Sequence, residues 1–471
     1  MDTLTKAAYL LAKTSASFVK VAPEEELKIR SYSFAGKCFE CGFAQTSITP
    51  PDLLKRTYWM AGYDIWKKIT GILDETTASA MWLSCGGDGI ILLSCDLIGI
   101  TGFDLDIIRK KLRSFSLLSG CKHIILSCTH THGGIDTMGY WGPLPKSGKD
   151  EKYMDFLMKK LEEICVNAYK NRKQGKLYYG NIEAAELVNR WREPMNFTNN
   201  RLNRFRFVPF DGSKEIWYLN FGAHPNTMGG KNKMLSADYP CYMRREIKRH
   251  IDADILFSIS TIGTTDIGKI GERPTERTIL GGYMLGQKAL QIDNDRELSA
   301  DISLIVKHFV MPIDNPVLAV ANKVGIFTTK KCSSNSDLGI GFVSELNLLD
   351  IGGVKILTCP GEMFSELVLE GGYCDAASSA TGAGAEINPE PLNKLFGTEL
   401  IIFGVTNDMA GYCVAPNDFI LDKKRPFIDR GKDRFDRSHY HETNSCGINT
   451  GKTIYDACVE IKNEMKKIKK W

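Results

Sequence analysis

Apolar runs of strand length alternate with amphipathic stretches of helical spacing through much of the chain. Apolar runs at 89–100 and 123–130 predict strands, and residues 103–115 and 153–171 carry apolar side chains at the spacing of a helix. This alternation is typical of an α/β fold. Residues 1–35 differ, because a helical segment there is followed by a charged stretch, and we interpret them as an N-terminal lead-in.

The second half of the chain has a similar layout with more strands. The pattern predicts strand-rich regions at 176–224 and 302–357, helices at 242–251 and 363–372, strands at 254–261 and 399–412, and a Gly- and Pro-rich loop at 379–393. No clean linker or short repeat divides these segments. We therefore expect an α/β fold, with mixed β-sheets flanked by helices in one large two-lobed domain over residues 36–471.

The composition narrows the class of protein. Of 471 residues, 43% are hydrophobic and 25% are charged, which is normal for a globular protein and excludes disorder as the main state. The most apolar run, at 89–103, contains Asp96 and is shorter than the roughly 20 residues that a bilayer requires, so we expect no transmembrane segment. The net charge of +4, from 60 basic and 56 acidic residues, is too small an excess to predict nucleic acid as a partner.

Cysteine usage and the N-terminal stretch bear on location. The chain has 14 cysteines, and several, such as Cys95, Cys128 and Cys359, stand inside apolar runs. Buried free thiols in a reducing compartment fit this placement better than a disulfide scaffold does. The N-terminal stretch lacks the long apolar segment of a secretory signal. We therefore expect a cytoplasmic protein.

Four of the predicted strands end abruptly in side chains suited to metal binding. These polar ends lie at 129–134, 224–226, 360–362 and 407–412. In α/β sheets, ligands collect in the crevice at the carboxyl ends of the strands. If the four strands share sheets and direction, their ends converge, and the sequence then predicts a metal site at the strand C-terminal ends.

The residue types at these ends match a hydrolytic metal site. Two neutral imidazoles and one carboxylate form a common three-ligand zinc set that leaves a position for water, and the metal lowers the pKa of that water to near neutrality. His130 and His132 point to the same side of an extended segment, so both can be ligands, or one can be an acid–base partner. Taken singly, each residue also has a structural interpretation: a buried histidine at position 224, a helix cap for Glu362 or a core aromatic for Tyr412.

Further motifs accompany the polar strand ends. In chain order, the motifs are GFAQTSITP at 42–50, MAGY at 60–63, CTHTHGG at 128–134, Asn189-Arg190, NFGAHPNTM at 220–228, SAD at 236–238, PGEMFSE at 360–366 and TNDMAGY at 406–412. In this order they resemble the catalytic domain of the neutral/alkaline non-lysosomal ceramidase family over roughly positions 40–446. The match is specific because THTH, PGE and the spaced tyrosine occur together, whereas any one of them alone is weak.

The resemblance implies a zinc ion and a set of site residues. The family holds zinc with the first His of THTH, the later His, the Glu of PGE and the last Tyr, which at this chain's positions are His130, His224, Glu362 and Tyr412. The second His of THTH and the Arg of the Asn-Arg pair line the active site there, which implies catalytic roles for His132 and Arg190. Each implied ligand falls on one of the polar strand ends identified above.

These residues predict a zinc-dependent hydrolase of a carbon–nitrogen amide bond, acting on an N-acyl amide through metal-activated water. The substrate is a lipid amide or a smaller soluble amide, because Gly133 and Met409 stand where the family motifs have Ser and Tyr. The alternatives are a metal-dependent hydrolase of an ester, lactone or cyclic amide, and a non-catalytic metal-binding homologue. The polar loop at 416–445, with His439 and His441, lines the substrate entrance or is simply solvated. The sequence leaves the oligomeric state open.

Overall fold

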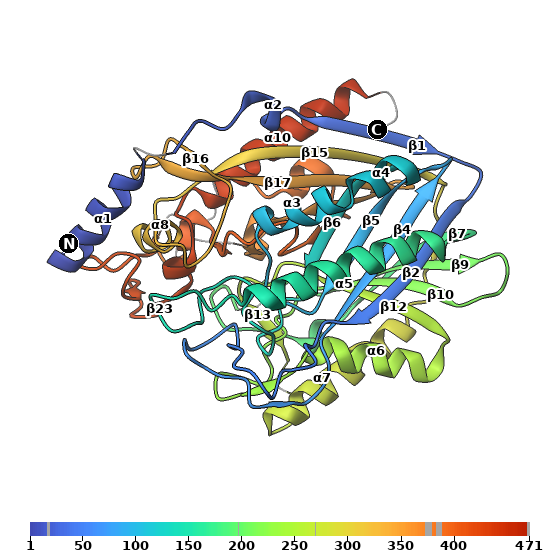
Figure 1. The fold of residues 1–471 in the computed structure, drawn as a ribbon, viewed down its shortest axis with the longest axis horizontal. Coiled ribbons are helices and arrows are strands. Elements are labelled where there is room, and N and C mark those ends of the chain that lie inside the picture. The colour runs from blue at the N-terminus through green and yellow to red at the C-terminus, as the bar shows by residue number, and fades with distance from the viewer. Residues whose placement is uncertain (17–18, 196, 269, 373–378, 383–388, 469–471) are drawn as a thin grey trace.

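The computed structural model describes residues 1–16, 19–195, 197–268, 270–372, 379–382 and 389–468. Two large mixed sheets form the centre of the fold (Figure 1). The larger, nine-stranded sheet has the order β12-β10-β9-β7-β2-β4-β5-β6, with β14 paired to β7. Its strands are β2 (Phe39–Ser47), β4 (Thr77–Cys85), β5 (Asp88–Cys95), β6 (Cys121–Cys128), β7 (Lys173–Glu183), β9 (Arg201–Pro209), β10 (Glu215–Phe221), β12 (Ala253–Ile259) and β14 (Arg296–Glu297).

The six-stranded sheet has the order β1-β15-β17-β18-β20, with β16 paired to β17. Its strands are β1 (Arg30–Ala35), β15 (Asp301–Pro312), β16 (Lys331–Ser333), β17 (Ile340–Ile351), β18 (Val354–Thr358) and β20 (Ile401–Phe403). Short strands pair outside both sheets: β3 (Gly71–Ile72) with β11 (Met234–Leu235), β8 (Val188–Arg190) with β13 (Thr265–Ile267), β19 (Glu362–Met363) with β21 (Tyr412–Cys413), and β22 (Gly431–Lys432) with β23 (Ser438–His439).

The α-helices surround the two sheets. They are α1 (Thr3–Ala16), α2 (Glu24–Leu27), α3 (Gly102–Lys111), α4 (Arg113–Ser119), α5 (Glu151–Lys170), α6 (Tyr239–His250), α7 (Pro274–Leu290), α8 (Pro316–Lys323), α9 (Asn393–Phe396) and α10 (Thr450–Lys467). Short 3₁₀ turns occur at Ala185–Leu187, Ser365–Leu367, Pro416–Asp418 and His441–Asn444.

The two sheets pack face to face over a shared apolar core. Alternate residues of each strand point into this core, such as Leu83 and Leu92 from the larger sheet and Leu304 and Ile356 from the smaller. The intervening residues face outward, because successive side chains of a strand point to opposite faces. The two sheets thus share one interface.

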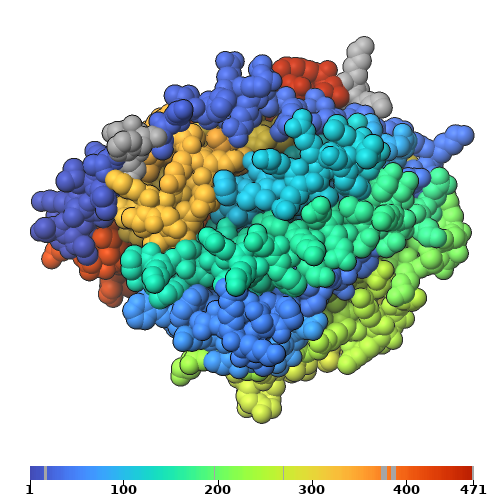
Figure 2. All heavy atoms as spheres, viewed as in Figure 1, coloured from blue at the N-terminus to red at the C-terminus, as the bar shows by residue number. Residues whose placement is uncertain are grey.

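Helices cover the outer face of each sheet. On the larger sheet, Leu157 and Leu161 of α5 pack with Trp82 and Leu93 of the strands beneath. On the smaller sheet, α10 supplies a buried stripe that joins the core of β15 and β17: Ile454, Cys458, Ile461 and Met465. Figure 2 shows α3, α4 and α5 side by side on one face, with residues 48–76 below them.

The prediction of an α/β fold with mixed sheets flanked by helices is confirmed. Predicted helices at 153–171 and 242–251 correspond to α5 and α6, and the predicted strands at 123–130 and 254–261 correspond to β6 and β12. The lead-in contains α1 and α2, and its last residues form β1, which pairs with β15.

The predicted helix at 363–372 is wrong. The segment instead continues from β19 into a single 3₁₀ turn at Ser365–Leu367. All residues from 363 to 368 are buried, including Phe364, Leu367 and Val368, whereas Glu370 and Gly371 are exposed. The apolar spacing over 363–368 therefore reflects burial on every side. The region 302–357 is mostly strands, as expected, but also contains helix α8. Of the predicted loop at 379–393, residues 383–388 lie outside the described ranges.

Among the described residues, every helix is too short or too polar to cross a membrane. The cysteines of the described ranges all carry free thiols, and most of them are buried.

Candidate functional site

The four polar strand ends come together in the structure. Residues 404–407, which follow β20, run between the ends of the two outer strands of the larger sheet. The backbone N–H of Gly404 donates to the carbonyl of Ile259 at the end of β12 (2.9 Å), and the N–H of Asn407 donates to that of Leu126 on β6 (2.8 Å). One segment of the smaller sheet thus links both outer strands of the larger one.

His130 stands two residues after the end of β6 and has a left-handed backbone, with φ of 62°. This conformation is costly for a residue with a side chain, and such strain collects at functional sites. Nδ1 of His130 lies 2.6 Å from the carbonyl oxygen of Ile98. Because a carbonyl only accepts, Nδ1 carries the hydrogen, and the lone pair of Nε2 is available to a metal ion.

His224 follows β10 and is anchored in the same way. Its backbone N–H donates to the carbonyl of Thr265 (2.9 Å), and its Nδ1 lies 3.1 Å from that oxygen. Nε2 of His224 lies 2.8 Å from Oε2 of Glu362, and Nε2 of His130 lies 3.5 Å from the same oxygen. Two imidazole nitrogens and one carboxylate oxygen therefore converge in a space that the chain buries.

Glu362 and Tyr412 are held together by a strand pair. They are direct partners in the parallel pairing of β19 with β21. Burial alone would raise the pKa of Glu362, but the positive charges that His130 and His224 carry when they are protonated, together with their hydrogen bonds, hold it well below its usual range. Burial raises the pKa of the Tyr412 phenol, and the nearby carboxylate of Glu362 adds to the effect. The hydroxyl of Tyr412 lies 3.4 Å from that of Tyr440.

His132 completes the cluster but has no anchor. Both ring nitrogens are buried, and neither has a hydrogen-bond partner in the described part of the chain. Its ring centroid lies 5.0 Å from that of His130, 5.6 Å from that of His224 and 4.9 Å from that of Tyr63. Burial and the charges of the two neighbouring histidines hold the pKa of His132 well below its usual range, so the ring is neutral.

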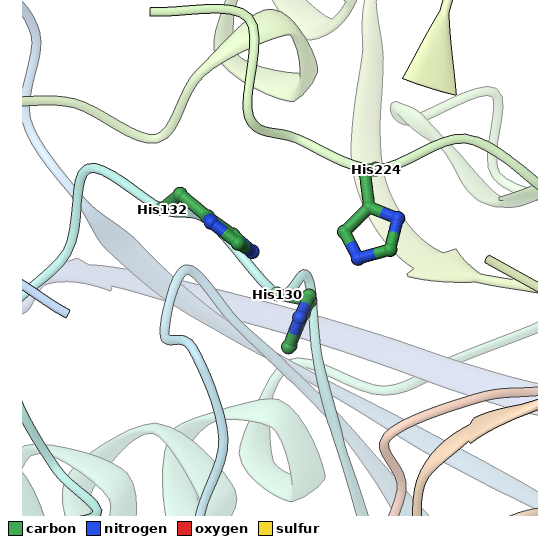
Figure 3. Close-up of side chains that lie close together, drawn as sticks. All are labelled: His130, His132 and His224. Carbon is green, nitrogen blue, oxygen red and sulfur yellow. The ribbon is translucent and has the colours of Figure 1, made fainter. Parts of the chain in front are cut away.

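Two overlapping groups of side chains can hold a metal ion. The ring nitrogens of His130, His132 and His224 lie within 4.8 Å of one another, and Figure 3 shows the three rings around one space. Alternatively, Glu362 replaces His132 as the third ligand. The hydrogen bonds favour the second group, because both of its histidines have Nδ1 fixed by a carbonyl and His132 has neither nitrogen fixed.

Arg190 lies on β8 opposite Thr265, the residue that anchors His224. Its guanidinium is fully buried and pairs with Glu366, which is also fully buried. Its other N–H groups donate to the backbone carbonyls of Arg192 (2.6 Å), Phe197 (2.8 Å) and Glu193 (3.2 Å). These are the contacts of a positioning residue beside the site, and a direct catalytic role for Arg190 stays a prediction.

Sequence reasoning missed Arg192. Its guanidinium pairs with Asp418 and with Glu442 at 2.8 Å, and it donates to Nδ1 of His441 at 2.6 Å. It also lies 2.7 Å from Nδ1 of His439, which faces Oε1 of Glu442 at 2.9 Å. These partners lie far away in sequence, between positions 418 and 442. The signal in the sequence was the second arginine of the segment NRWR at 189–192, which stands on the same side of an extended chain as Arg190.

Gly62 provides a test of which histidines are ligands. It has φ of 107°, and a Cβ there would lie 2.5 Å from Cγ of His132. We expect Gly62→Ala to displace the His132 ring and to lower kcat by about 100-fold, the scale of a misplacement of about 1 Å. Bound metal should be retained at the wild-type ratio, because the preferred ligand group does not include His132. Steady-state kinetics and elemental analysis of the purified variant measure both quantities.

Gly87→Ala is the matched control for Gly62→Ala. Gly87 has a similar φ of 101°, and a Cβ there meets nothing within 4 Å, so the control carries the same backbone strain without the clash. Loss of metal in Gly62→Ala alone would instead make His132 a ligand.

The fold is similar to that of two solved structures. The crystal structure of the neutral ceramidase from Pseudomonas aeruginosa matches with a TM-score of 0.66 and 15% sequence identity, over 91% of this chain and 75% of that one. A structure described as ceramidase complexed with C2 matches with a TM-score of 0.67 and 14% identity, over the same shares. No family model and no curated protein sequence matches the chain. The predicted ceramidase fold is therefore confirmed, at an identity that shows the fold alone.

Proposed function

We propose that the protein is a zinc-dependent hydrolase of a carbon–nitrogen amide bond, with zinc held by His130, His224, Glu362 and Tyr412. One observation carries the proposal. Nε2 of two buried histidines, each with Nδ1 fixed by a backbone carbonyl, faces the same oxygen of Glu362. Imidazole nitrogens and a carboxylate oxygen are the ligand types of hydrolytic zinc sites. Zinc bound there would lower the pKa of a water molecule and polarise a carbonyl group.

The remaining site residues have roles that follow from their contacts. His132 is neutral, and its ring nitrogens are buried and have no hydrogen-bond partner among the described residues, so a ring nitrogen can accept a proton from water and pass it to the leaving amine. Arg190 holds Glu366 and the backbone beside His224. We propose that the catalytic domain spans residues 36–471. β1, from the lead-in, is the edge strand of its six-stranded sheet.

The substrate we propose is an N-acyl amide, either a lipid amide or a smaller soluble one. The two structural neighbours are described as ceramidases, which supports an amide bond as the target. The free thiols of the described cysteines support a reducing, cytoplasmic location.

Removal of the metal tests this proposal. We expect a zinc chelator to abolish hydrolysis of N-acyl amides and added zinc to restore it. In our proposal the nucleophile is water that depends on the metal for its activation, and no protein side chain can replace it. The assay uses short-chain and long-chain N-acyl amides together with esters of matching acyl groups. Hydrolysis that survives complete removal of metal contradicts the proposal.

The other outcomes of the same assay select an alternative. Cleavage of the esters without cleavage of any amide would make the protein an esterase-type metal hydrolase. Purified protein that contains no metal and takes up none on incubation would make it a non-catalytic homologue.

A further inference from the structure

His441 lies next to the proposed zinc ligands, in the segment that follows β23. Its side chain is buried, and its ring centroid lies 4.7 Å from that of Tyr412 and 6.1 Å from that of Trp191. Both of these aromatic rings also border His224, at 6.5 Å and 5.7 Å between centroids. His441 therefore shares its aromatic surroundings with a ligand histidine, although the two are far apart in the chain.

The position of the hydrogen on the His441 ring follows from its partner. Nη1 of Arg192 lies 2.6 Å from Nδ1 of His441. A guanidinium has only donors, so Nδ1 must accept and carries no hydrogen. A ring that carries no hydrogen on Nδ1 is neutral, because the charged form has a hydrogen on both nitrogens. The single ring hydrogen is therefore on Nε2.

Nε2 of His441 is buried, and it has no hydrogen-bond partner in the part of the chain that the structure describes. A buried donor without a partner destabilises the folded chain. Arg192 occupies the other ring nitrogen, and the aromatic rings that border His441 supply no carbonyl or carboxylate oxygen: those of Trp191, Phe364, Tyr412 and Tyr440. A ligand with an acceptor oxygen would satisfy this donor.

The position of Arg192 is itself fixed. Asp418 and Glu442 pair with the guanidinium, and Nη2 also donates to the backbone carbonyl of Asp418. With these groups occupied, Nη1 remains directed at His441. Arg192 is thus a positioning residue that selects one tautomer of His441.

We propose that His441 donates a hydrogen bond from Nε2 to the carbonyl oxygen of the scissile amide, with Arg192 fixing the tautomer that makes this donation. The proposal rests on the proposed amide hydrolase function and adds a substrate-contacting residue to it. Charge develops on that oxygen when water adds to the carbonyl carbon, so a prearranged neutral donor binds the transition state better than the substrate. The aromatic residues around His441 exclude water and strengthen the hydrogen bond.

Two substitutions separate the two nitrogen atoms of His441. In His441→Asn, the side-chain oxygen can take the place of Nδ1 and accept from Arg192, but no donor reaches the Nε2 position. In His441→Gln, the amide N–H₂ can reach the Nε2 position, but the acceptor for Arg192 is lost. We expect kcat to fall about 100-fold in His441→Asn, with KM changed little, and about tenfold in His441→Gln.

The opposite order of activities overturns the proposal. If His441 only anchors Arg192, His441→Asn will be close to wild type and His441→Gln will be the impaired variant. The same two substitutions at His250, which is exposed on α6, are the controls and should leave kcat unchanged. Thermal unfolding of each variant separates loss of the donor from loss of the fold.

A measurement without substrate tests the tautomer. Nitrogen NMR of protein labelled at the histidine rings distinguishes Nε2–H from Nδ1–H, and the signal missing from His441→Asn identifies His441. We expect Nε2–H in the wild type, and finding Nδ1–H overturns the proposal. Zinc content should be the wild-type value in both His441 variants. If zinc-loaded wild type hydrolyses no amide, the proposed function fails first and the substrate contact of His441 fails with it.

Discussion

Replacing His224 with alanine is expected to abolish both zinc binding and hydrolysis. Nε2 of His224 is one of two imidazole nitrogens that face Oε2 of Glu362, so its removal leaves the ion with too few protein ligands. Loss of the metal removes several kcal/mol of transition-state stabilisation. The expected loss of kcat/KM is therefore about 10³-fold or more.

Elemental analysis and the amide assay, run on the same preparation, measure these two losses. His224→Phe is the companion variant, because it keeps an aromatic ring between Trp191 and Tyr412 without a ligand nitrogen. His250→Ala is the control for a histidine that lies outside the site and is exposed. A His224→Ala protein that retains the wild-type zinc ratio would remove His224 from the ligand set.

Arg190→Met is expected to reduce the free energy of unfolding by about 3–5 kcal/mol, the usual cost of removing one partner of a buried ion pair. Both side chains of the Arg190–Glu366 pair are 0% exposed, so the substitution leaves a buried carboxylate without a counter-charge. The backbone carbonyls of Arg192, Glu193 and Phe197 lose their donor at the same time. The urea concentration at half-unfolding measures the effect.

A second substitution separates the two possible roles of Arg190. In Arg190→Met with Glu366→Leu, both charges are gone, and most of the lost stability should return. Lys452→Met, which breaks an exposed pair with Asp456, is the control and should change stability by less than about 1 kcal/mol. If Arg190→Met leaves stability unchanged and lowers only kcat, Arg190 acts on the substrate and does not position the backbone.

The convergence of the polar strand ends could be anticipated from the sequence because their residues interrupt apolar strands. The strands before His130 and His224 are almost wholly apolar, and each ends directly at the polar motif. Such a boundary is a local feature, so it can be read without the fold. The boundary does not itself show that the strand ends converge. Their convergence depends on residues 404–407, which bond to both β6 and β12.

The features that could not be predicted from the sequence depend on contacts between residues that are far apart in the chain. Arg192 binds His441 across 249 positions, and nothing near either residue predicts that contact. The helix expected at 363–372 failed for a related reason. Phe364 and Val368 have helical spacing, but both are buried, and the surrounding core decides the backbone where no solvated face exists.

The segment at 404–407 also affects when the site forms. It bonds to β6 across very long separations: Ser127 to Thr406 spans 279 positions, and Leu126 to Asn407 spans 281. On the ribosome, both histidines emerge long before this segment, and contacts between such distant positions form late because the loop between them must close first. Metal capture in the proposed geometry therefore depends on completing the C-terminal third of the chain, not on the appearance of the histidines. Zinc loading would be a final step of biosynthesis, coupled to the docking of the last strands.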